Sequence, residues 1–127
     1  MKSTDIPPTH ILIIDDDESI LDAVSLLLSD FGYLVDTISH GEEAVMKVPQ
    51  LLPNIILLDV LMSGVDGRDI CKSLKQDEKT KHIPIIMLSA HPGVSKNMSE
   101  YGADGFLSKP FEIDDLLKTI EKFVQKD

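Results

Sequence analysis

Short runs of large apolar residues alternate along this chain with segments in which apolar residues recur every three or four positions. Ile11–Ile14 and Ile55–Leu58 are continuous apolar runs, a pattern typical of strands covered on both faces of a parallel sheet. Three further segments are rich in residues that favour strands, at 33–38, 83–88 and 105–107. The pattern therefore predicts five strands.

The segments between these strands have helical periodicity. The first predicted helix stops at Gly32, and its apolar face consists of Ile20, Val24, Leu27, Leu28 and Phe31. Ser39 and Glu42 have the spacing of a capping box, which predicts a second helix through Ala44, Val45 and Val48. Pro49 lacks an amide proton, so we expect a kink or an early end of that helix there.

Three more helices complete the alternation. One runs through Ile70, Cys71 and Leu74, a weak one lies near 95–101, and a strong one closes the chain with the face Ile113, Leu116, Leu117, Ile120, Phe123 and Val124. Five strands and five helices in alternation predict a doubly wound α/β domain, in which helices cover both faces of a parallel sheet.

Size and charge narrow the class of protein. The 127 residues suit one domain of the commonest size, about 100 to 150 residues, and the polar, proline-broken residues 1–9 suggest a disordered N-terminal extension. The net charge of −10 argues against direct binding to nucleic acid, which needs clustered Lys and Arg. The lone Cys71 is expected in the core, and the lack of a long apolar segment predicts a cytoplasmic protein without a membrane anchor.

The predicted strands run into polar residues at their ends. Asp15, Asp16 and Asp17 follow the first, Asp59 ends the third, Ser89 the fourth, and Ser108 and Lys109 the fifth. Parallel strands bring these groups to one edge of the sheet, where ligands bind in folds of this class. Crowded carboxylates repel each other unless a cation joins them, and Mg²⁺ prefers such oxygen ligands.

This grouping suggests phosphoryl transfer. Asp59 stands alone at its strand end, so it is the candidate nucleophile that forms an aspartyl phosphate, with Asp15 and Asp16 as metal ligands. Ser89 and Lys109 would complement the charge of the phosphoryl group. Taken singly, each residue also has an ordinary role: Asp59 as a loop start, Ser89 and Lys109 as surface groups, and Asp17 as a helix cap.

Four segments in this order and spacing resemble the receiver domain of two-component response regulators, the CheY-like superfamily: "ILIIDDDESI", "IILLDVLMSGVDG", "IIMLSA" and "GFLSKPF". The resemblance covers about 11–124 and implies a flavodoxin-like sheet of strand order 2-1-3-4-5. It assigns the acidic pair to Asp15 and Asp16, the phosphoacceptor to Asp59, the switch hydroxyl to Ser89 and the lysine to Lys109. It further implies that the Leu61 carbonyl binds Mg²⁺, that Pro110 follows a cis peptide bond, and that Phe106 is a rotating aromatic.

The resemblance also implies partners. Such domains take a phosphoryl group from a sensor histidine kinase or a histidine phosphotransfer protein, and a downstream protein reads the surface near the fourth helix and fifth strand. A receiver catalyses only its own phosphorylation and dephosphorylation. Whether the chain works alone or within a larger regulator or hybrid kinase, and whether phosphorylation makes it dimerise, is left open.

Three features depart from the family pattern: Ser63, the Pro92-Gly93 pair and Pro49, whose expected effect on the second helix is given above. Ser63 stands where proline is usual, which predicts a more mobile loop, and Pro92-Gly93 predict a short or late fourth helix. His91 is either a residue that steers water at the rim of the site or an ordinary loop histidine. Two other functions are compatible with parts of this pattern. A haloacid-dehalogenase-like phosphohydrolase would need an acid where Leu61 stands, and a pseudo-receiver would keep the fold without phosphorylation.

Overall fold

The computed structural model describes residues 7–90 and 98–124 of the chain. Its central sheet has five parallel strands in the order β2-β1-β3-β6-β7. These strands are β1 (His10–Ile14), β2 (Leu34–Ile38), β3 (Ile55–Asp59), β6 (Ile85–Ser89) and β7 (Gly105–Ser108). The predicted doubly wound α/β fold and its strand order are therefore confirmed.

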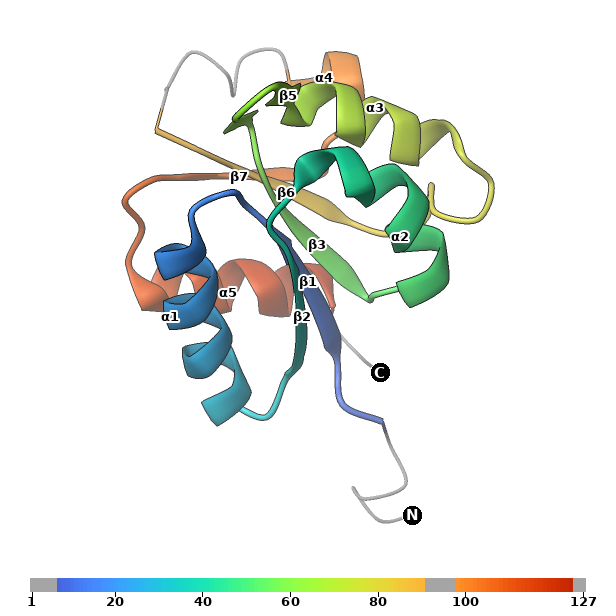
Figure 1. The fold of residues 1–127 in the computed structure, drawn as a ribbon. Coiled ribbons are helices and arrows are strands. Elements are labelled where there is room, and N and C mark those ends of the chain that lie inside the picture. Colours follow the sequence, from blue (N-terminus) through green and yellow to red (C-terminus); the bar gives the residue numbers. More distant parts are fainter. Residues whose placement is uncertain (1–6, 91–97, 125–127) are drawn as a thin grey trace.

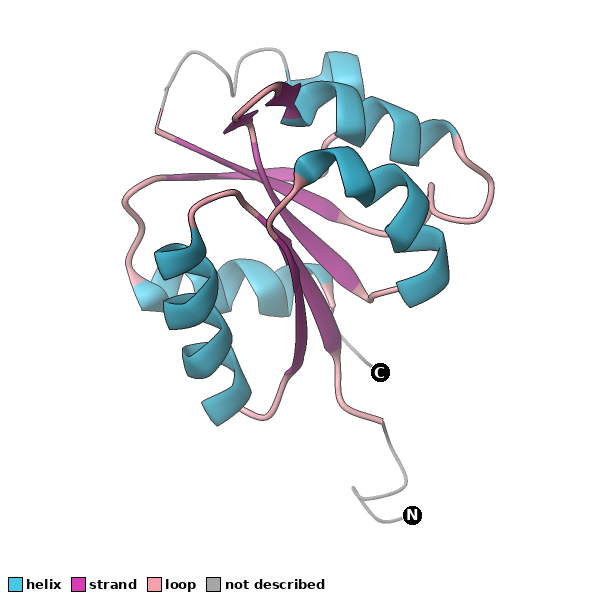
Figure 2. Cartoon of the chain, viewed as in Figure 1, coloured by secondary structure: helices cyan, strands magenta, loops and turns pink. Residues whose placement is uncertain are grey.

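Helices cover both faces of the sheet (Figures 1 and 2). One face carries α1 (Glu18–Asp30) and α5 (Ile113–Phe123), and the other carries α2 (Ala44–Leu51), α3 (Gly67–Gln76) and α4 (Met98–Tyr101). A 3₁₀ turn, η2 (Gly41–Glu43), precedes α2, and a small hairpin of β4 (Leu61–Met62) and β5 (Val65–Asp66) joins β3 to α3. In the described part of the chain no helix is long and apolar enough to cross a membrane.

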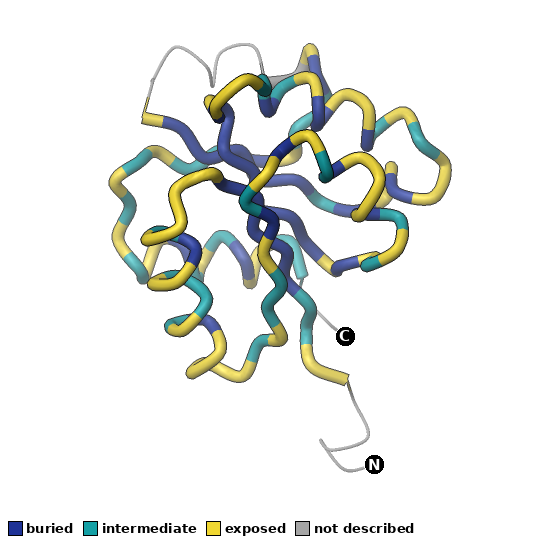
Figure 3. Tube along the Cα trace, in the orientation of Figure 1, coloured by how far each residue is buried: buried dark blue, intermediate teal, exposed yellow. Residues whose placement is uncertain are grey.

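The sheet divides the core into two apolar clusters. Successive residues of a strand point to opposite faces, so Leu12 and Ile14 pack with α2, α3 and α4, while Ile11 and Ile13 pack with α1 and α5. All four are fully buried. Figure 3 shows the buried strands between helices with exposed outer sides. This burial on both faces is the physical reason for the continuous apolar runs in the sequence.

Cys71 lies in the core as predicted. It is fully buried in the cluster beneath α3, and burial raises the pKa of its thiol to about 12. The thiol therefore stays protonated and unreactive at neutral pH.

Two local predictions about the first two helices were wrong, and one was confirmed. Phe31 lies past the end of α1 and is 59% exposed, whereas Leu21 supplies the buried position near the start of the helix. The expected capping box at Ser39 and Glu42 does not form: His40 caps η2 without a side-chain bond, and the Ser39 hydroxyl pairs with the His40 ring instead. The Gly32 stop is confirmed by its positive φ of 93°.

Pro49 does not end α2, which continues to Leu51. An ideal helix would bond the missing N–H to the carbonyl of Val45, and Val45 lies on the exposed side of α2, where water can satisfy that carbonyl. The helix ends where Leu52 adopts a left-handed conformation with φ of 46°, directly before Pro53.

The predictions for the N-terminal extension and for the start of the fourth helix concern residues that lie largely outside the described part of the chain. Residues 1–6 of the expected N-terminal extension, and the Pro92-Gly93 pair with His91, lie outside the described residues. Within the described residues, α4 covers four residues, Met98–Tyr101.

Candidate phosphorylation site

Backbone hydrogen bonds extend the parallel sheet by one residue beyond its strands and fix the polar residues found there. The Asp15 N–H donates to the Ile38 carbonyl at 3.1 Å, and the Val60 N–H, directly after Asp59, donates to the Leu88 carbonyl at 3.0 Å. The Lys109 N–H donates to the Ser89 carbonyl at 2.9 Å. The four strand ends predicted to meet are therefore held in register at one edge of the sheet.

Three carboxylates lie together at this edge. Asp15, Asp16 and Asp59 each offer an oxygen, and these oxygens lie within 4.8 Å of one another. Asp15 is fully buried, Asp59 is 7% exposed and Asp16 is open to solvent. The cluster thus has a buried floor and one exposed side, from which a ligand can approach.

Lys109 supplies the positive charge of the site. Its ammonium lies 2.8 Å from Asp15 Oδ2 and 3.3 Å from Asp59 Oδ1. Burial lowers the pKa of this ammonium, but the hydrogen bond and charge of Asp15, together with Asp59, outweigh burial and raise it overall. Lys109 therefore stays charged and bridges two of the three acids.

The positive charge of Lys109 does not offset the effects of burial and of the neighbouring negative charges on Asp59. Burial, followed by repulsion from Asp15, raises the pKa of Asp59 to about 6, against the attraction of Lys109. The carboxyl is mostly ionised at neutral pH, at an energetic cost that a bound cation would relieve. Oxygen donors that gather negative charge in this way are the ligands of hard divalent ions such as Mg²⁺.

The first loop orients the acidic pair. The Asp17 N–H donates to Asp15 Oδ1 at 3.0 Å, and the Asp17 side chain accepts from the Ser19 and Ile20 amides at the start of α1. The hydrogen bond to the Ser19 hydroxyl is the largest cause of the lowered pKa of Asp17. Asp17 is thus the helix cap that the sequence predicted, and Asp15 is held from both of its oxygens.

The remaining predicted site residues surround this cluster. Ser89 is 2% exposed at the end of β6, the strand next to β3. Phe106 is half-buried on β7 and packs against the cluster of α2, α3 and α4. The Lys109-Pro110 bond is cis, as expected. Leu61 begins β4 with its side chain exposed.

Sequence reasoning missed the β4–β5 hairpin and the tight approach at its base. The Gly67 N–H donates to the Val60 carbonyl at 2.6 Å, and a Cβ atom on Gly67 would collide with the Asp59 carbonyl oxygen. Because Gly67 has no Cβ, α3 can begin directly against the backbone of the candidate phosphoacceptor. The signal was the glycine directly after the helix cap Asp66.

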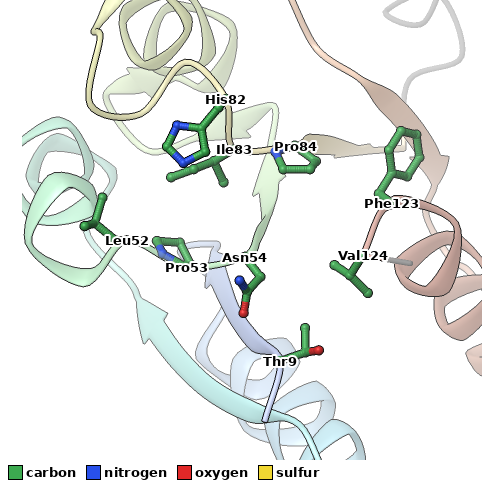
Figure 4. A pocket seen from close by; sticks show the side chains of 9 residues that line it. All are labelled: Thr9, Leu52, Pro53, Asn54, His82, Ile83, Pro84, Phe123 and Val124. Carbon is green, nitrogen blue, oxygen red and sulfur yellow. The ribbon is translucent and has the colours of Figure 1, made fainter. Parts of the chain in front are cut away.

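Hollows on the surface distinguish the two ends of the sheet. A groove of about 260 Å³ lies beside Asp16, whereas a cavity of about 400 Å³ lies at the opposite end of the sheet (Figure 4). That second cavity contains no member of the acidic cluster; it is lined by Thr9, Leu52, Pro53, Asn54, His82, Ile83, Pro84, Phe123 and Val124. The chemistry therefore lies at the edge formed by the carboxyl ends of the strands.

Comparison with known proteins agrees with this fold and site. Residues 11–121 match the family model of the response regulator receiver domain. A putative response regulator from Chloroflexus aurantiacus superposes with a TM-score of 0.85 at 36% identity, over 94% of this chain and 99% of that one. TrrA from Thermotoga maritima, solved in complex with Mg²⁺-BeF, gives 0.82 at 30% identity, over 91% and 98%.

The chain belongs to the response regulator receiver domain family. Such domains are signalling domains of two-component systems and not metabolic enzymes, and the acidic cluster lies at the family's phosphorylation site. The phosphohydrolase alternative thereby loses its basis.

Among curated proteins, the chain is 36% identical over 119 residues to RpaA of Synechocystis, a DNA-binding dual master transcriptional regulator. The match covers 92% of this chain and 49% of RpaA. The chain spans about half, or less, of the length of the curated relatives it matches.

Proposed function

We propose that this chain is a single phosphorylatable receiver domain in which Asp59 accepts a phosphoryl group from a phosphohistidine. The observation that carries the proposal is the position of Asp59, buried beside Asp15 and bridged to it by Lys109. The donor is the phosphohistidine of a sensor histidine kinase or of a histidine phosphotransfer protein.

The donor set suits a magnesium ion. Asp15, Asp16 and Asp59 would hold it together with the backbone carbonyl of Leu61, and three carboxylate oxygens within 4.8 Å of each other are compatible with one hard cation. When bound, the ion would neutralise charge on the phosphoryl oxygens and on the carboxylates. The related response regulator TrrA was solved in complex with Mg²⁺-BeF, which supports this assignment.

The transfer is a displacement at phosphorus. A carboxylate oxygen of Asp59 attacks, the new P–O bond forms, and the P–N bond to the donor imidazole breaks. The electron pair of that bond stays on the imidazole nitrogen, which takes a proton from solvent. When the phosphorylated domain is hydrolysed, water attacks phosphorus and the P–O bond to Asp59 breaks. The Asp59 carboxylate is restored and inorganic phosphate is released.

Side chains of the chain itself assist each stage. Asp59 is mostly ionised above its pKa of about 6, so the nucleophile is available at neutral pH. Lys109, 3.3 Å from Asp59 Oδ1, would stabilise the equatorial phosphoryl oxygens as its contact with the free carboxylate is replaced. Asp15 keeps that ammonium in place through the 2.8 Å contact.

Phosphate on Asp59 would bias a two-state equilibrium. Ser89 would move to hydrogen-bond a phosphoryl oxygen, and Phe106, half-buried on β7, would turn inward behind it. The surface near α4 and β7 would change with it, and a downstream protein would read that surface. RpaA is named as DNA-binding; here any such activity would belong to a further domain or a partner.

An apolar hollow beside the site offers a contact surface for the phosphodonor protein. A hollow of about 390 Å³ lies between α1 and the β7–α5 loop. Lys109 lines its edge, and the other lining residues are Ser19, Ile20, Ala23, Val24, Ala90, Pro110 and Phe111. A helix of the donor packed there would bring its phosphohistidine to Asp59.

Intact mass after incubation with Mg²⁺ and acetyl phosphate tests the proposal. The wild type should gain one phosphoryl group and lose it again on standing, and Asp59→Asn should gain none. Asp66→Asn is a matched control, because Asp66 lies nearby on β5 outside the cluster and should leave the gain intact. If the folded wild type binds Mg²⁺ but gains nothing from acetyl phosphate or from a phosphohistidine donor, the pseudo-receiver alternative holds.

A further inference from the structure

The hairpin that follows Asp59 contacts the acidic cluster through a backbone amide. The Ser63 N–H, at the tip of the hairpin, donates to Asp16 Oδ2 at 2.7 Å. Asp16 is exposed, so packing does not hold its side chain. The hydrogen bond therefore fixes the orientation of the Asp16 carboxylate beside Asp15 and Asp59.

Several contacts hold the hairpin that carries this amide. Its two strands pair antiparallel, with Leu61 opposite Asp66 and Met62 opposite Val65, and the Gly67–Val60 bond closes its base. Met62 and Val65 also pack over the 3₁₀ turn.

The packing over the turn depends on a glycine. A Cβ atom on Gly41 would lie 3.1 Å from Met62 Cε and 3.3 Å from Val65 Cγ1. The hairpin is thus held at its base, along its strands and against η2, so the Ser63 amide is positioned before any ligand arrives.

We propose that the Ser63 amide is a positioning group for the metal site: it orients the Asp16 carboxylate for Mg²⁺ and thereby raises the affinity of the chain for the ion. The inference deepens the proposed function, on which it rests. Groups that orient a metal ligand through a hydrogen bond typically contribute a factor of about 10 to 100 in affinity. Because Asp16 is exposed, we expect the lower end, about tenfold.

The contact is a property of this sequence. Receivers that carry proline at this position have no N–H to donate, so the orientation of the second acid must come from elsewhere in them. Ser63 was expected to loosen the loop; the hydrogen bond instead ties the loop to the acidic pair.

Mg²⁺ titration by calorimetry tests the inference without phosphorylation. Ser63→Pro removes the donor and should weaken the binding of Mg²⁺ about tenfold, whereas Ser63→Ala retains the amide and should bind as the wild type does. An amide-to-ester replacement at residue 63 removes the N–H without a proline ring, so it gives the same information if Ser63→Pro does not fold. In the wild type, the amide proton of Ser63 should resonate downfield and lose that shift in Asp16→Ala.

Each outcome separates the two proposals. Wild-type affinity in a folded ester or proline variant would overturn the positioning role while leaving the receiver function intact. An equal loss in Ser63→Ala would also overturn it, because the side chain would then be responsible. A wild type that binds no Mg²⁺ would overturn the metal assignment itself.

Discussion

The ionised carboxylate of Asp59 is expected to destabilise the metal-free protein at neutral pH. Burial and the nearby Asp15 disfavour its charge, and in the unfolded chain both effects disappear. Replacing Asp59 with Asn removes the charge while keeping the size and polarity of the side chain. Lys109 keeps its 2.8 Å contact with Asp15, so the substitution leaves no buried cation without a partner.

The size of the effect follows from the pKa. A change in the pKa of Asp59 from 3.8 to about 6 corresponds to about 3 kcal/mol, since each pKa unit is worth about 1.4 kcal/mol. We expect Asp59→Asn to raise the free energy of unfolding at pH 7 by about 1–3 kcal/mol. Few surface substitutions exceed about 0.5 kcal/mol, so the increase is measurable.

The pH dependence fixes the sign. The pKa of Asp59 is higher in the folded state, so the folded protein binds the extra proton, and its stability falls as pH rises from 3.8 to about 6. The Asn variant lacks this loss. Its advantage over the wild type should therefore be complete above pH 6, shrink as the pH falls, and vanish below 3.8.

Urea unfolding followed by far-ultraviolet circular dichroism, in EDTA and across this pH range, measures the difference. Asp22→Asn, an exposed position on α1, is the matched control and should change stability little. An Asp59→Asn protein that is no more stable than the wild type at pH 7, or whose advantage persists at pH 3.5, would refute the electrostatic account of the site.

Three further predictions concern the metal, the backbone beside the site, and the contacts of α3 at the opposite end of the sheet. Mg²⁺ at 100 times its Kd should stabilise the wild type by about 2.7 kcal/mol, reversibly with EDTA; thermal unfolding should show a smaller gain for Asp16→Asn, and an equal gain would contradict its role as a ligand. Gly67→Ala should cost about 2–3 kcal/mol in urea unfolding because its Cβ would collide with the Asp59 carbonyl oxygen, whereas Gly64→Ala, with φ of 73° but open space around it, should cost only about 1 kcal/mol. Lys75→Met should cost about 1–3 kcal/mol, because Lys75 bonds the Lys81 and Ile83 carbonyls and Asp104; a similar cost for the exposed Lys72→Met would contradict that reasoning.

The sheet and the site were predictable because both follow from short-range rules. Strands buried on two faces must be continuously apolar, so Ile11–Ile14 and Ile55–Leu58 could be read directly. Parallel pairing then places the residues at the ends of the strands at the same edge of the sheet, so the sequence alone predicts that Asp15, Asp59 and Lys109 lie together.

The errors arose where tertiary contacts decide between local options. In α1, the predicted apolar face included Phe31 and omitted Leu21, whereas Phe31 is 59% exposed and Leu21 is buried, because the rotation and the end of the helix decide which residues face the sheet. Pro49 was tolerated because the affected carbonyl faces solvent. These outcomes depend on the orientation of each helix against the sheet, which periodicity leaves open.

The hairpin contacts were beyond sequence reasoning for a different reason. A two-residue strand has almost no periodicity, and the bond from Ser63 to Asp16 joins residues 47 positions apart. Such a contact needs the register of β1 and β3 and the path of the loop together. The serine at position 63, where proline is usual in the family, drew attention to this loop. It did not indicate which group the amide of Ser63 contacts.

Mapping the phosphorylated residue tests the central claim most directly. An aspartyl phosphate formed with acetyl phosphate and Mg²⁺ is reduced by borohydride to homoserine, and the modified residue can be located by peptide sequencing in the mass spectrometer. We predict homoserine at Asp59 and at no other aspartate of the tryptic peptide 48–68, which also contains Asp66. Homoserine at Asp15, Asp16 or Asp66, with Asp59 unmodified, would contradict the assignment.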